Sequence, residues 1–391
     1  MRDFTYQNGT RVLFGKTAQS AVGTEMRKLG SPVLLHYGSG SIKKTGLYDE
    51  VRRLLAHEGL EVFELGGVQP NPRLSLVREG IRLCREKGIA SILAVGGGSV
   101  IDSAKAIGIG APHDGDVWDF FTRKAEPTRS LPLGVVLTLP ASGSETSISC
   151  VLSDGENQDK LASNAAVQRP AFAIMNPEHT FTLPAWQVGC GITDIMGHVM
   201  ERYFTTEPEV DLTDRLCEAT LKTVIDAAPK TLRNPDDYAP RAEIVWAGSL
   251  AHNGLLDTGR IGDWATHRIE HELSAFYDVA HGAGLAVLFP AWMRYVYKRD
   301  LPRFVQFAVR VWDVDQSFAD PEGTALEGIR RMRDFFVSIG MPVTLDGLGI
   351  GKDRFDEMAT KSQRFGALGQ FVKIEKQDVL AILNLALQKD W

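Results

Sequence analysis

The sequence predicts an α/β domain built on a parallel sheet, followed by an all-α domain. Up to residue 183, short apolar runs bounded by glycine alternate with amphipathic helical segments, which is typical of a Rossmann-like parallel sheet covered by helices. Beyond residue 183, long helical patterns replace the strand-like runs. The length of 391 residues suits two domains better than one. We therefore expect an N-terminal α/β domain over residues 1–183 and a helical domain over residues 184–391.

The expected elements follow from hydrophobic periodicity and from glycine and proline punctuation. The strongest strand signal is the run Ile-Ala-Ser-Ile-Leu-Ala-Val at residues 89–95. Further strands are expected at residues 11–14, 32–37, 60–65, 134–139 and 171–175. Helices of the first domain are expected at residues 45–58, 73–87 and 99–109. Those of the second are expected at residues 185–204, 211–231, 240–256, 263–276 and 282–297, with several more to the C-terminus.

Composition and charge exclude several classes of protein. Apolar residues make up 44% and charged residues 24%, as in a soluble globular protein. The net charge of −6 and the scattered basic residues argue against a nucleic-acid surface. We find no apolar run of the roughly 18 residues that would span a membrane and no signal-peptide core at the start. The four cysteines form no C-x-x-C pair, so reduced thiols and a cytoplasmic location are expected.

Three predicted strand ends share the chemistry of phosphate binding. Gly96-Gly-Gly-Ser99 stands where a strand meets a helix, and glycines let backbone N–H groups approach a pyrophosphate. A glycine run that is not G-x-G-x-x-G can also be only a tight turn. Similar residues at two other strand ends, 38–41 and 138–145, favour a phosphate-bearing ligand. The candidate contacts are Gly38, Ser39, Ser41, Gly97, Gly98, Ser99, Asp102, Thr138, Ser142 and Ser144.

The form of the dinucleotide is predicted from the segment at residues 38–41. NAD enzymes of this architecture often carry an acidic residue at an early strand end, where it binds the ribose hydroxyls. Here that end carries glycine and serine, and Lys43 and Lys44 follow. We therefore expect NADP(H) to be favoured over NAD(H). The alternative is that both lysines are solvated helix residues.

A cluster of metal-binding residue types lies between positions 194 and 281. Asp194 and His198 are four residues apart, so on a helix they share one face, and His267 and His271 repeat this spacing. His281 follows at a helix entry. The flanking residues are small and apolar, and buried charges need partners. We predict that Asp194, His198, His267 and His281 bind one divalent metal, and these ligands suit Fe(II), Zn(II), Co(II) or Ni(II).

These residues carry a resemblance to a known family. The chain resembles the iron-containing (group III) alcohol dehydrogenases, and within them the branch of NADP(H)-dependent aldehyde reductases and butanol dehydrogenases. Six segments match in the right order and cover nearly the whole chain. They are Pro70-Asn-Pro72, Gly96-Gly-Gly-Ser-x-x-Asp-x-x-Lys105, Thr138-Leu-Pro-Ala-Ser-Gly-Ser-Glu145, Asp159-Lys160, Asp194-x-x-x-His198 and His267-x-x-x-His271-x9-His281.

The resemblance implies a dehydroquinate synthase-like architecture, in which residues 1–183 form a dinucleotide-binding domain and residues 184–391 form a helical metal-binding domain. It places Asp194, His198, His267 and His281 on one metal, Fe(II) or Zn(II). It implies hydride transfer between NADP(H) and small to medium aldehydes or primary alcohols; the alternative is an NADH-preferring butanol dehydrogenase. His271 matches a position near the metal that does not ligate it, where it would place substrate or relay a proton, or simply pack. Asn71 and Lys160 join the cofactor contacts, Lys160 near the nicotinamide ribose. A homodimer through an N-terminal edge strand is also expected.

Two remote alternatives differ in class. A dehydroquinate synthase-like lyase would need several basic residues for an acidic substrate, but the metal-bearing segments show mainly Arg260 and Arg268. Trp264, Phe276 and Tyr277 favour a less polar substrate. A non-catalytic nucleotide-binding protein would have lost metal ligands, and all four are present.

Overall fold

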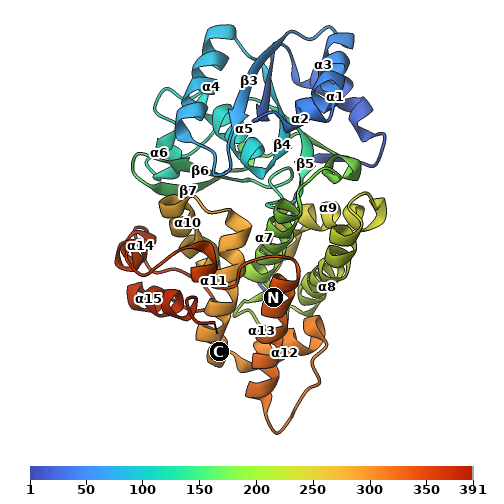
Figure 1. The fold of residues 1–391 in the computed structure, drawn as a ribbon. Helices are drawn as coiled ribbons and strands as arrows, with labels where there is room; N and C mark the ends of the chain where they lie inside the picture. Colours follow the sequence, from blue (N-terminus) through green and yellow to red (C-terminus); the bar gives the residue numbers. More distant parts are fainter. Residues whose placement is uncertain (390–391) are drawn as a thin grey trace. The chain divides into compact units, whose positions relative to one another are not determined.

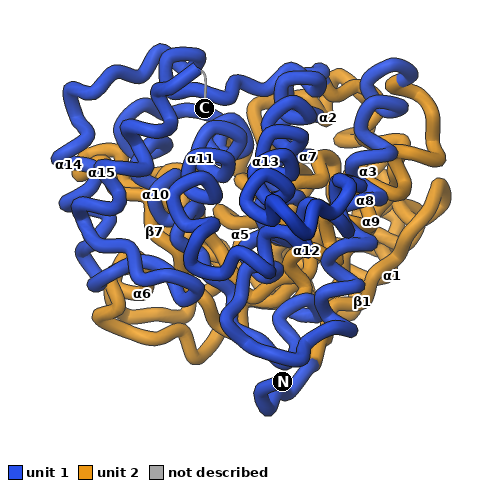
Figure 2. Tube along the Cα trace, turned by 90° about the horizontal axis from the view of Figure 1, so that it is seen from below, with its two compact units in different colours: residues 1–6, 184–234, 254–391 blue, residues 7–183, 235–253 orange. Residues whose placement is uncertain are grey.

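The computed structural model describes residues 1–389 and divides into two compact units (Figures 1 and 2). Unit 2 comprises residues 7–183 and 235–253, and unit 1 comprises residues 1–6, 184–234 and 254–391. The chain passes between the units at residue 183. The division is nevertheless not a single cut, because residues 235–253 belong with unit 2 and the first six residues with unit 1.

Unit 2 is built on a six-stranded sheet in which all paired neighbours run parallel. The strand order is β1-β8-β5-β4-β2-β3. The bounds are β1 (Arg11–Phe14), β2 (Val33–Gly38), β3 (Val62–Val68), β4 (Ser91–Gly97), β5 (Leu133–Leu139) and β8 (Phe172–Met175). The predicted parallel α/β sheet is confirmed.

Helices cover both faces of this sheet. They are α1 (Val22–Leu29), α2 (Ser41–Lys44), α3 (Leu47–His57), α4 (Leu74–Lys87), α5 (Gly98–Gly110), α6 (Trp118–Phe121) and α9 (Tyr238–His252). Alternate strand residues belong to different apolar clusters, because successive side chains of a strand point to opposite faces. Leu34 and Ile92 pack in the cluster of α4, α5 and α6. Leu35 and Leu93 pack in the cluster of α1 and α3.

Strand β3 continues to Val68, three residues beyond its predicted end at Leu65. The sequence predicts the earlier end because the glycine pair Gly66-Gly67 is typical of a break after a strand. Instead, Gly66 passes against the Tyr37 ring, where an added Cβ would lie 2.6 Å from Cε2. The glycine therefore lets the strand run beneath an aromatic side chain, which is a tertiary requirement that the local sequence does not reveal.

An antiparallel hairpin, β6 (Ser149–Asp154) and β7 (Asp159–Asn164), was not predicted. Its strands are short and rich in polar residues, so they lack the apolar run that marks a buried strand. Helix α5 holds the hairpin through two side chains. Asp102 Oδ2 accepts from the backbone N–H of Val151 at 3.0 Å, and Lys105 Nζ donates to the Ser149 carbonyl at 2.7 Å.

Unit 1 is helical, and its helices are α7 (Ala185–Tyr203), α8 (Asp211–Arg233), α10 (Ala265–Tyr277), α11 (His281–Val296), α12 (Leu301–Trp312), α13 (Pro321–Ser338), α14 (Phe355–Ser362) and α15 (Lys376–Leu385). Short 3₁₀ turns lie at η1 (Ala18–Ala21), η2 (Ala166–Gln168), η3 (Pro177–Thr180), η4 (Leu255–Asp257), η5 (Tyr297–Arg299) and η6 (Asp346–Leu348). The helical C-terminal part is confirmed. The helix predicted at 240–256 ends at His252, since Gly254 takes a left-handed φ of 93°.

Among residues 1–389, we find no helix with both the length and the apolar character that crossing a membrane requires.

A fully buried histidine ties the sheet of unit 2 to α5. His36 Nδ1 lies 2.7 Å from the Leu65 carbonyl oxygen, and Nε2 lies 2.8 Å from Ser103 Oγ. A carbonyl only accepts, so Nδ1 carries the proton and Nε2 accepts from the serine hydroxyl. Burial lowers the pKa of His36 to about 4 from 6.5.

This histidine predicts an acid-dependent loss of stability. Between pH 6.5 and about 4 the unfolded chain binds the His36 proton and the folded chain does not, so stability falls as pH falls through this window. The full shift corresponds to about 3 kcal/mol. Urea unfolding should show a steeper pH dependence for wild type than for His36→Gln, which cannot titrate. Equal slopes would contradict the assignment.

Candidate functional site

Four candidate metal ligands come from three helices of unit 1. Asp194 and His198 lie one turn apart on α7, where every residue from Gly191 to Tyr203 is buried. His267 lies in the first turn of α10, and His281 is the first residue of α11. Because helix α7 is enclosed along this stretch, the polar pair is held away from solvent.

The structure brings these four side chains together. Asp194 Oδ1 lies 3.0 Å from His198 Nδ1, 4.0 Å from His267 Nε2 and 3.7 Å from His281 Nε2. One ligand atom from each of Asp194, His267 and His281 lies within 4.8 Å of the others. The rings of His198 and His267 have centroids 4.6 Å apart. Asp194, His267 and His281 are close enough to surround one cation, and His198 lies beside them with its Nδ1 on Asp194.

The Nδ1 atom of each histidine faces a hydrogen-bond acceptor, which for His267 and His281 is a glutamate outside the group. His198 Nδ1 lies 2.9 Å from the Asp194 carbonyl oxygen, and His267 Nδ1 lies 2.8 Å from Glu201 Oε1. His281 Nδ1 contacts Glu270 Oε2. Since these oxygens accept, each ring carries its proton on Nδ1 and keeps a lone pair on Nε2. Three such imidazoles and one carboxylate fit a transition metal.

Sequence reasoning missed Glu201 and Glu270. Each lies three residues after a candidate ligand, Glu201 after His198 and Glu270 after His267, so helical spacing was a signal that could have found them. Burial and the neighbouring Asp263 carboxylate raise the pKa of Glu201, while the backbone N–H groups of His267 and Trp264 oppose the rise. Burial likewise raises the pKa of Asp263.

His271 lies beside the candidate metal group. Its ring centroid is 5.8 Å from that of His281, and the side chain is half-buried. One nitrogen of His271 lies within 4.8 Å of ligand atoms of Glu270 and His281, but not of the set that includes Asp194. Its position next to His281 leaves it at the margin of the group.

A close helix contact sets the place of His281. Gly282 packs on the backbone of Cys190 in α7, and a Cβ at Gly282 would lie 2.0 Å from the Cys190 carbonyl oxygen. Only glycine allows α11 to approach α7 this closely. The sequence Asp-Val-Ala-His-Gly therefore couples a ligand to the residue that brings its helix into contact.

In unit 2, the predicted glycine and serine loops follow three adjacent strands. The ends of β2, β4 and β5 lie side by side in the sheet. From β2 the chain goes on to β3 on one side, and from β4 it goes on to β5 on the other, so the topology switches between β2 and β4. Ligands of open parallel sheets bind at such a point.

Glycines at the end of β4 and the start of α5 leave room for side chains of β5 and of the loop that follows it. A Cβ at Gly98, the first residue of α5, would lie 2.4 Å from Ser142 Oγ, and one at Gly97 would lie 3.0 Å from the Leu139 Cβ. Ser99 is in the first turn of α5, and Thr138 is half-buried near the end of β5. Backbone N–H groups at this helix start can face an anion.

Asp102 and Ser144 are engaged within unit 2. Ser144 Oγ donates to Asp102 Oδ1 at 2.5 Å and accepts from Lys105 Nζ at 2.9 Å. Burial lowers the pKa of Lys105 to about 8, and the Asp102 carboxylate opposes this shift. These side chains hold the loop after β5 against α5 and so fix the position of the loop.

The other candidate cofactor contacts, and the two lysines that follow β2, also belong to unit 2. Asn71 is buried between two prolines with a left-handed φ of 54°. Lys160 is buried on β7 opposite Ser153. Lys43 Nζ lies over the rings of Tyr37 and Tyr48, at 5.1 and 4.8 Å from their centroids. Lys44 is exposed.

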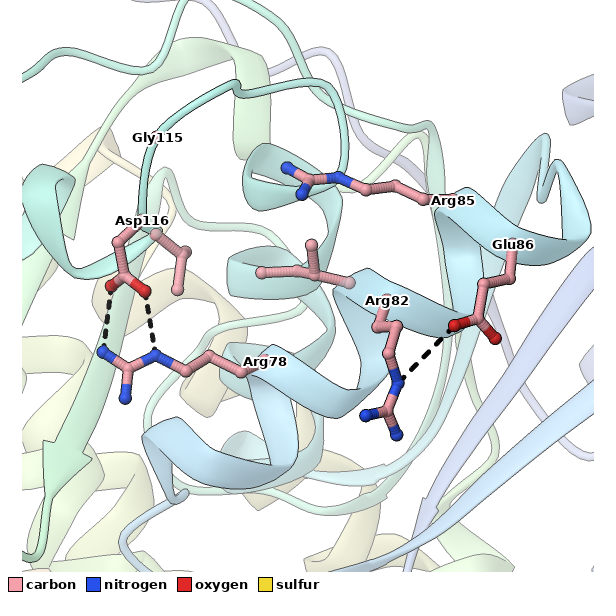
Figure 3. A pocket seen from close by; sticks show the side chains of 8 residues that line it. Arg78, Arg82, Arg85, Glu86, Gly115 and Asp116 are labelled. Carbon is pink, nitrogen blue, oxygen red and sulfur yellow. Dashed lines mark hydrogen bonds and ion pairs between the residues drawn. The ribbon is translucent and has the colours of Figure 1, made fainter.

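A hollow of about 280 Å³ on unit 2 lies between α4 and residues 115–117 (Figure 3). Its arginines are engaged by the protein. Arg78 makes a two-point contact with Asp116 at 2.9 and 3.1 Å, and Arg82 pairs with Glu86 at 3.7 Å. Arg85 donates to carbonyl oxygens at the end of α5. We assign no ligand to this hollow.

Two family models match the chain over these same regions. The model for iron-containing alcohol dehydrogenase matches residues 9–177, and the C-terminal model of the Fe-containing alcohol dehydrogenase family matches residues 190–387. The chain belongs to the iron-containing alcohol dehydrogenase family. The predicted family is confirmed, and with it an oxidoreductase that uses a nicotinamide cofactor and a divalent metal.

Similar proteins cover the chain nearly end to end. It is 45% identical to the probable NADH-dependent butanol dehydrogenase 2 of Bacillus subtilis, over 99% of this chain and 100% of that one. It is 37% identical to the NADPH-dependent aldehyde reductase YqhD of Escherichia coli, over 94% of each. The crystal structure of NADH-dependent butanol dehydrogenase A from Thermotoga maritima superposes with a TM-score of 0.96 at 36% identity, covering 99% of both chains.

The close contact at Gly282 yields a prediction for the metal group. Gly282→Ala would force α11 away from α7 and displace His281, because the new methyl group would overlap the Cys190 carbonyl. We expect a loss of about 1–3 kcal/mol in stability and a clear drop in bound metal per protein. Thermal unfolding and elemental analysis measure the two effects.

Gly155→Ala is the control. A Cβ at Gly155 would meet no atom within 4 Å, so this variant should keep its metal and its melting temperature. A Gly282→Ala protein with full metal content would show that the contact does not position His281.

Proposed function

We propose that the protein is a metal-dependent alcohol dehydrogenase and aldehyde reductase. It would transfer hydride between a nicotinamide dinucleotide and small to medium aldehydes or primary alcohols. One observation carries this proposal. Asp194 Oδ1 lies 4.0 Å from Nε2 of the buried His267 and 3.7 Å from Nε2 of the half-buried His281. The substrate class is supported by similar proteins that are named as a butanol dehydrogenase and an aldehyde reductase.

The proposed metal ligands are Asp194, His198, His267 and His281, and the proposed metal is Fe(II) or Zn(II). When bound, the metal would supply Lewis acidity at an aldehyde or alcohol oxygen, and the nicotinamide would supply or accept hydride. The helices of unit 1 bury Asp194, His198 and His267, and they leave the His281 side chain 23% exposed. His271, half-buried beside His281, would place the substrate or carry a proton.

The proposed dinucleotide contacts lie at the strand ends of unit 2. Backbone N–H groups and hydroxyls would bind the phosphates, and Asp102 and Ser144 would hold the loop that presents them. These contacts are Gly38, Ser39, Ser41, Gly97, Gly98, Ser99, Thr138 and Ser142. Asn71 and Lys160 complete the proposed set, Lys160 near the nicotinamide ribose.

Within this function, we propose NADP(H) as the favoured dinucleotide. Support comes from Lys43, whose ammonium group is held over Tyr37, the residue before Gly38 at the end of β2. A hydrogen bond with the Tyr37 hydroxyl raises the pKa of Lys43, which keeps the group cationic. The alternative is a preference for NADH. Several similar butanol dehydrogenases are named as NADH-dependent, which favours this alternative.

Two further parts of the proposal concern assembly and class. We propose a cytoplasmic homodimer that associates through an edge strand of the unit 2 sheet. A dehydroquinate synthase-like lyase and a non-catalytic nucleotide-binding protein are the remote alternatives. Oxidation of NADPH or NADH in the presence of butanal separates them from a reductase, because neither alternative consumes reduced dinucleotide.

Removal of the metal tests the proposed centre. The stripped protein should lose aldehyde reduction, and separate addition of Fe, Zn, Co or Ni should restore it to different degrees. His267→Ala removes one of the four ligands and should lower both bound metal and turnover by at least about tenfold. A His267→Ala protein with its metal and its full turnover would refute the ligand assignment.

Substitution of Lys43 tests the choice of dinucleotide. Wild type should show a higher kcat/KM for NADPH than for NADH. Lys43→Ala should lower the NADPH value by about tenfold, because a cation beside the 2′-phosphate is lost, and leave the NADH value nearly unchanged. The matched control is Lys44→Ala on the same short helix. A wild-type preference for NADH would overturn the choice of NADP(H).

A further inference from the structure

We propose that Glu201 and Glu270 are positioning residues of the metal centre, each of which accepts a hydrogen bond from Nδ1 of one ligand histidine and so directs the Nε2 lone pair of that ring at the cation. The inference rests on the proposed function, because it needs a metal at Asp194, His198, His267 and His281. Neither glutamate belongs to the ligand set predicted from the sequence.

Glu201 connects α7 to the start of α10. Its side chain is 1% exposed, and its Oε1 accepts from both the backbone N–H of His267 at 3.0 Å and the ring Nδ1 of the same residue at 2.8 Å. Its Oε2 accepts from the backbone N–H of Trp264. One carboxylate thus sets where α10 begins and how the His267 ring is turned.

The backbone around Trp264 shows how strongly this arrangement is determined. Trp264 has a left-handed φ of 65°, a conformation that costs energy for a bulky residue. Helix α10 receives no cap from its own N-cap side chain. The Glu201 carboxylate supplies acceptors to this helix start from another helix, where negative charge is favourable.

Glu270 connects α10 to the start of α11. The side chain is fully buried, with Oε2 on His281 Nδ1 and Oε1 accepting from Ser274 Oγ at 2.5 Å. Gly284 on α11 makes room for it, since a Cβ there would lie 2.8 Å from the Glu270 Cγ. Both carboxylate oxygens are therefore engaged, and the side chain has one available orientation.

The two carboxylates differ in how much the metal centre depends on them. The His267 side chain is 5% exposed and is enclosed by packing, whereas the His281 side chain is 23% exposed. The orientation of His281 therefore depends more on its hydrogen bond than on its neighbours. Carboxylates that orient metal-binding histidines typically change metal affinity by about 10- to 100-fold when they are removed. We expect the clearest effect at Glu270.

The test measures metal affinity in metal-stripped protein by chelator competition with Co(II), together with the visible spectrum of the bound Co(II). Glu270→Gln is nearly isosteric. Its amide either accepts from Nδ1 more weakly or donates to it, and the second case moves the histidine proton onto Nε2. We expect the Co(II) dissociation constant to rise about 10- to 100-fold and the spectrum to change.

Glu218→Gln is the matched control, because Glu218 is another buried glutamate of unit 1 that accepts from Tyr203 at 3.0 Å. It should lower the melting temperature of the metal-free protein and leave the Co(II) dissociation constant unchanged. Glu201→Gln is the second test variant. It should weaken Co(II) binding and also lower the melting temperature, since Glu201 contributes to the start of α10.

Each outcome has one meaning. If wild type binds no Co(II), the proposed metal site fails. If wild type binds Co(II) and neither Glu270→Gln nor Glu201→Gln changes affinity or spectrum, the positioning inference is overturned while the proposed function stands. Equal weakening by Glu218→Gln would also overturn it. If the variants fail to fold, histidine ¹⁵N shifts of metal-free wild type decide: Nδ1–H tautomers at His267 and His281 support the inference, and Nε2–H tautomers contradict it.

Discussion

The burial of the Asp194 carboxylate among histidines is the constraint on which the centre of unit 1 depends. A carboxylate that is 5% exposed is costly unless other groups compensate its charge. A divalent cation would supply that compensation, with imidazoles from three helices as its other ligands. The helices must then meet closely, which explains why Gly282 rests on the backbone of Cys190. The packing of α7, α10 and α11 therefore also determines the geometry of the polar group.

In unit 2 the corresponding constraint is the close packing of the start of α5 against the end of β5 and the loop that follows it. Glycine at positions 97 and 98 lets the start of α5 lie against the loop after β5. The buried Lys105 then holds that loop through Ser144 and through the carbonyls of Ser147 and Ser149. A loop held beside a helix start, at the switch point of a parallel sheet, is where open α/β sheets typically bind phosphate groups.

The predicted and observed bounds agree well for some strands and helices and poorly for others, and the difference has a physical reason. Strand β4 and helices α7 and α11 are long or strongly apolar, so periodicity alone located them within about two residues. The hairpin of β6 and β7 was missed because its strands are short and rich in polar residues, so they lack the apolar run that marks a buried strand. Strand β3 extends past Gly66 and Gly67. The glycine at position 66 leaves space for the Tyr37 ring of the neighbouring strand.

The sequence by itself determined the fold class, the family and the four metal-binding candidates, because hydrophobic period, glycine position and ligand spacing are local patterns. Tertiary structure alone decided which nitrogen of each histidine faces the centre. That choice depends on acceptors from other turns and other helices: Glu201 for His267 and Glu270 for His281. A ring orientation is set by the partner across the interface, and a linear pattern does not record which partners will meet.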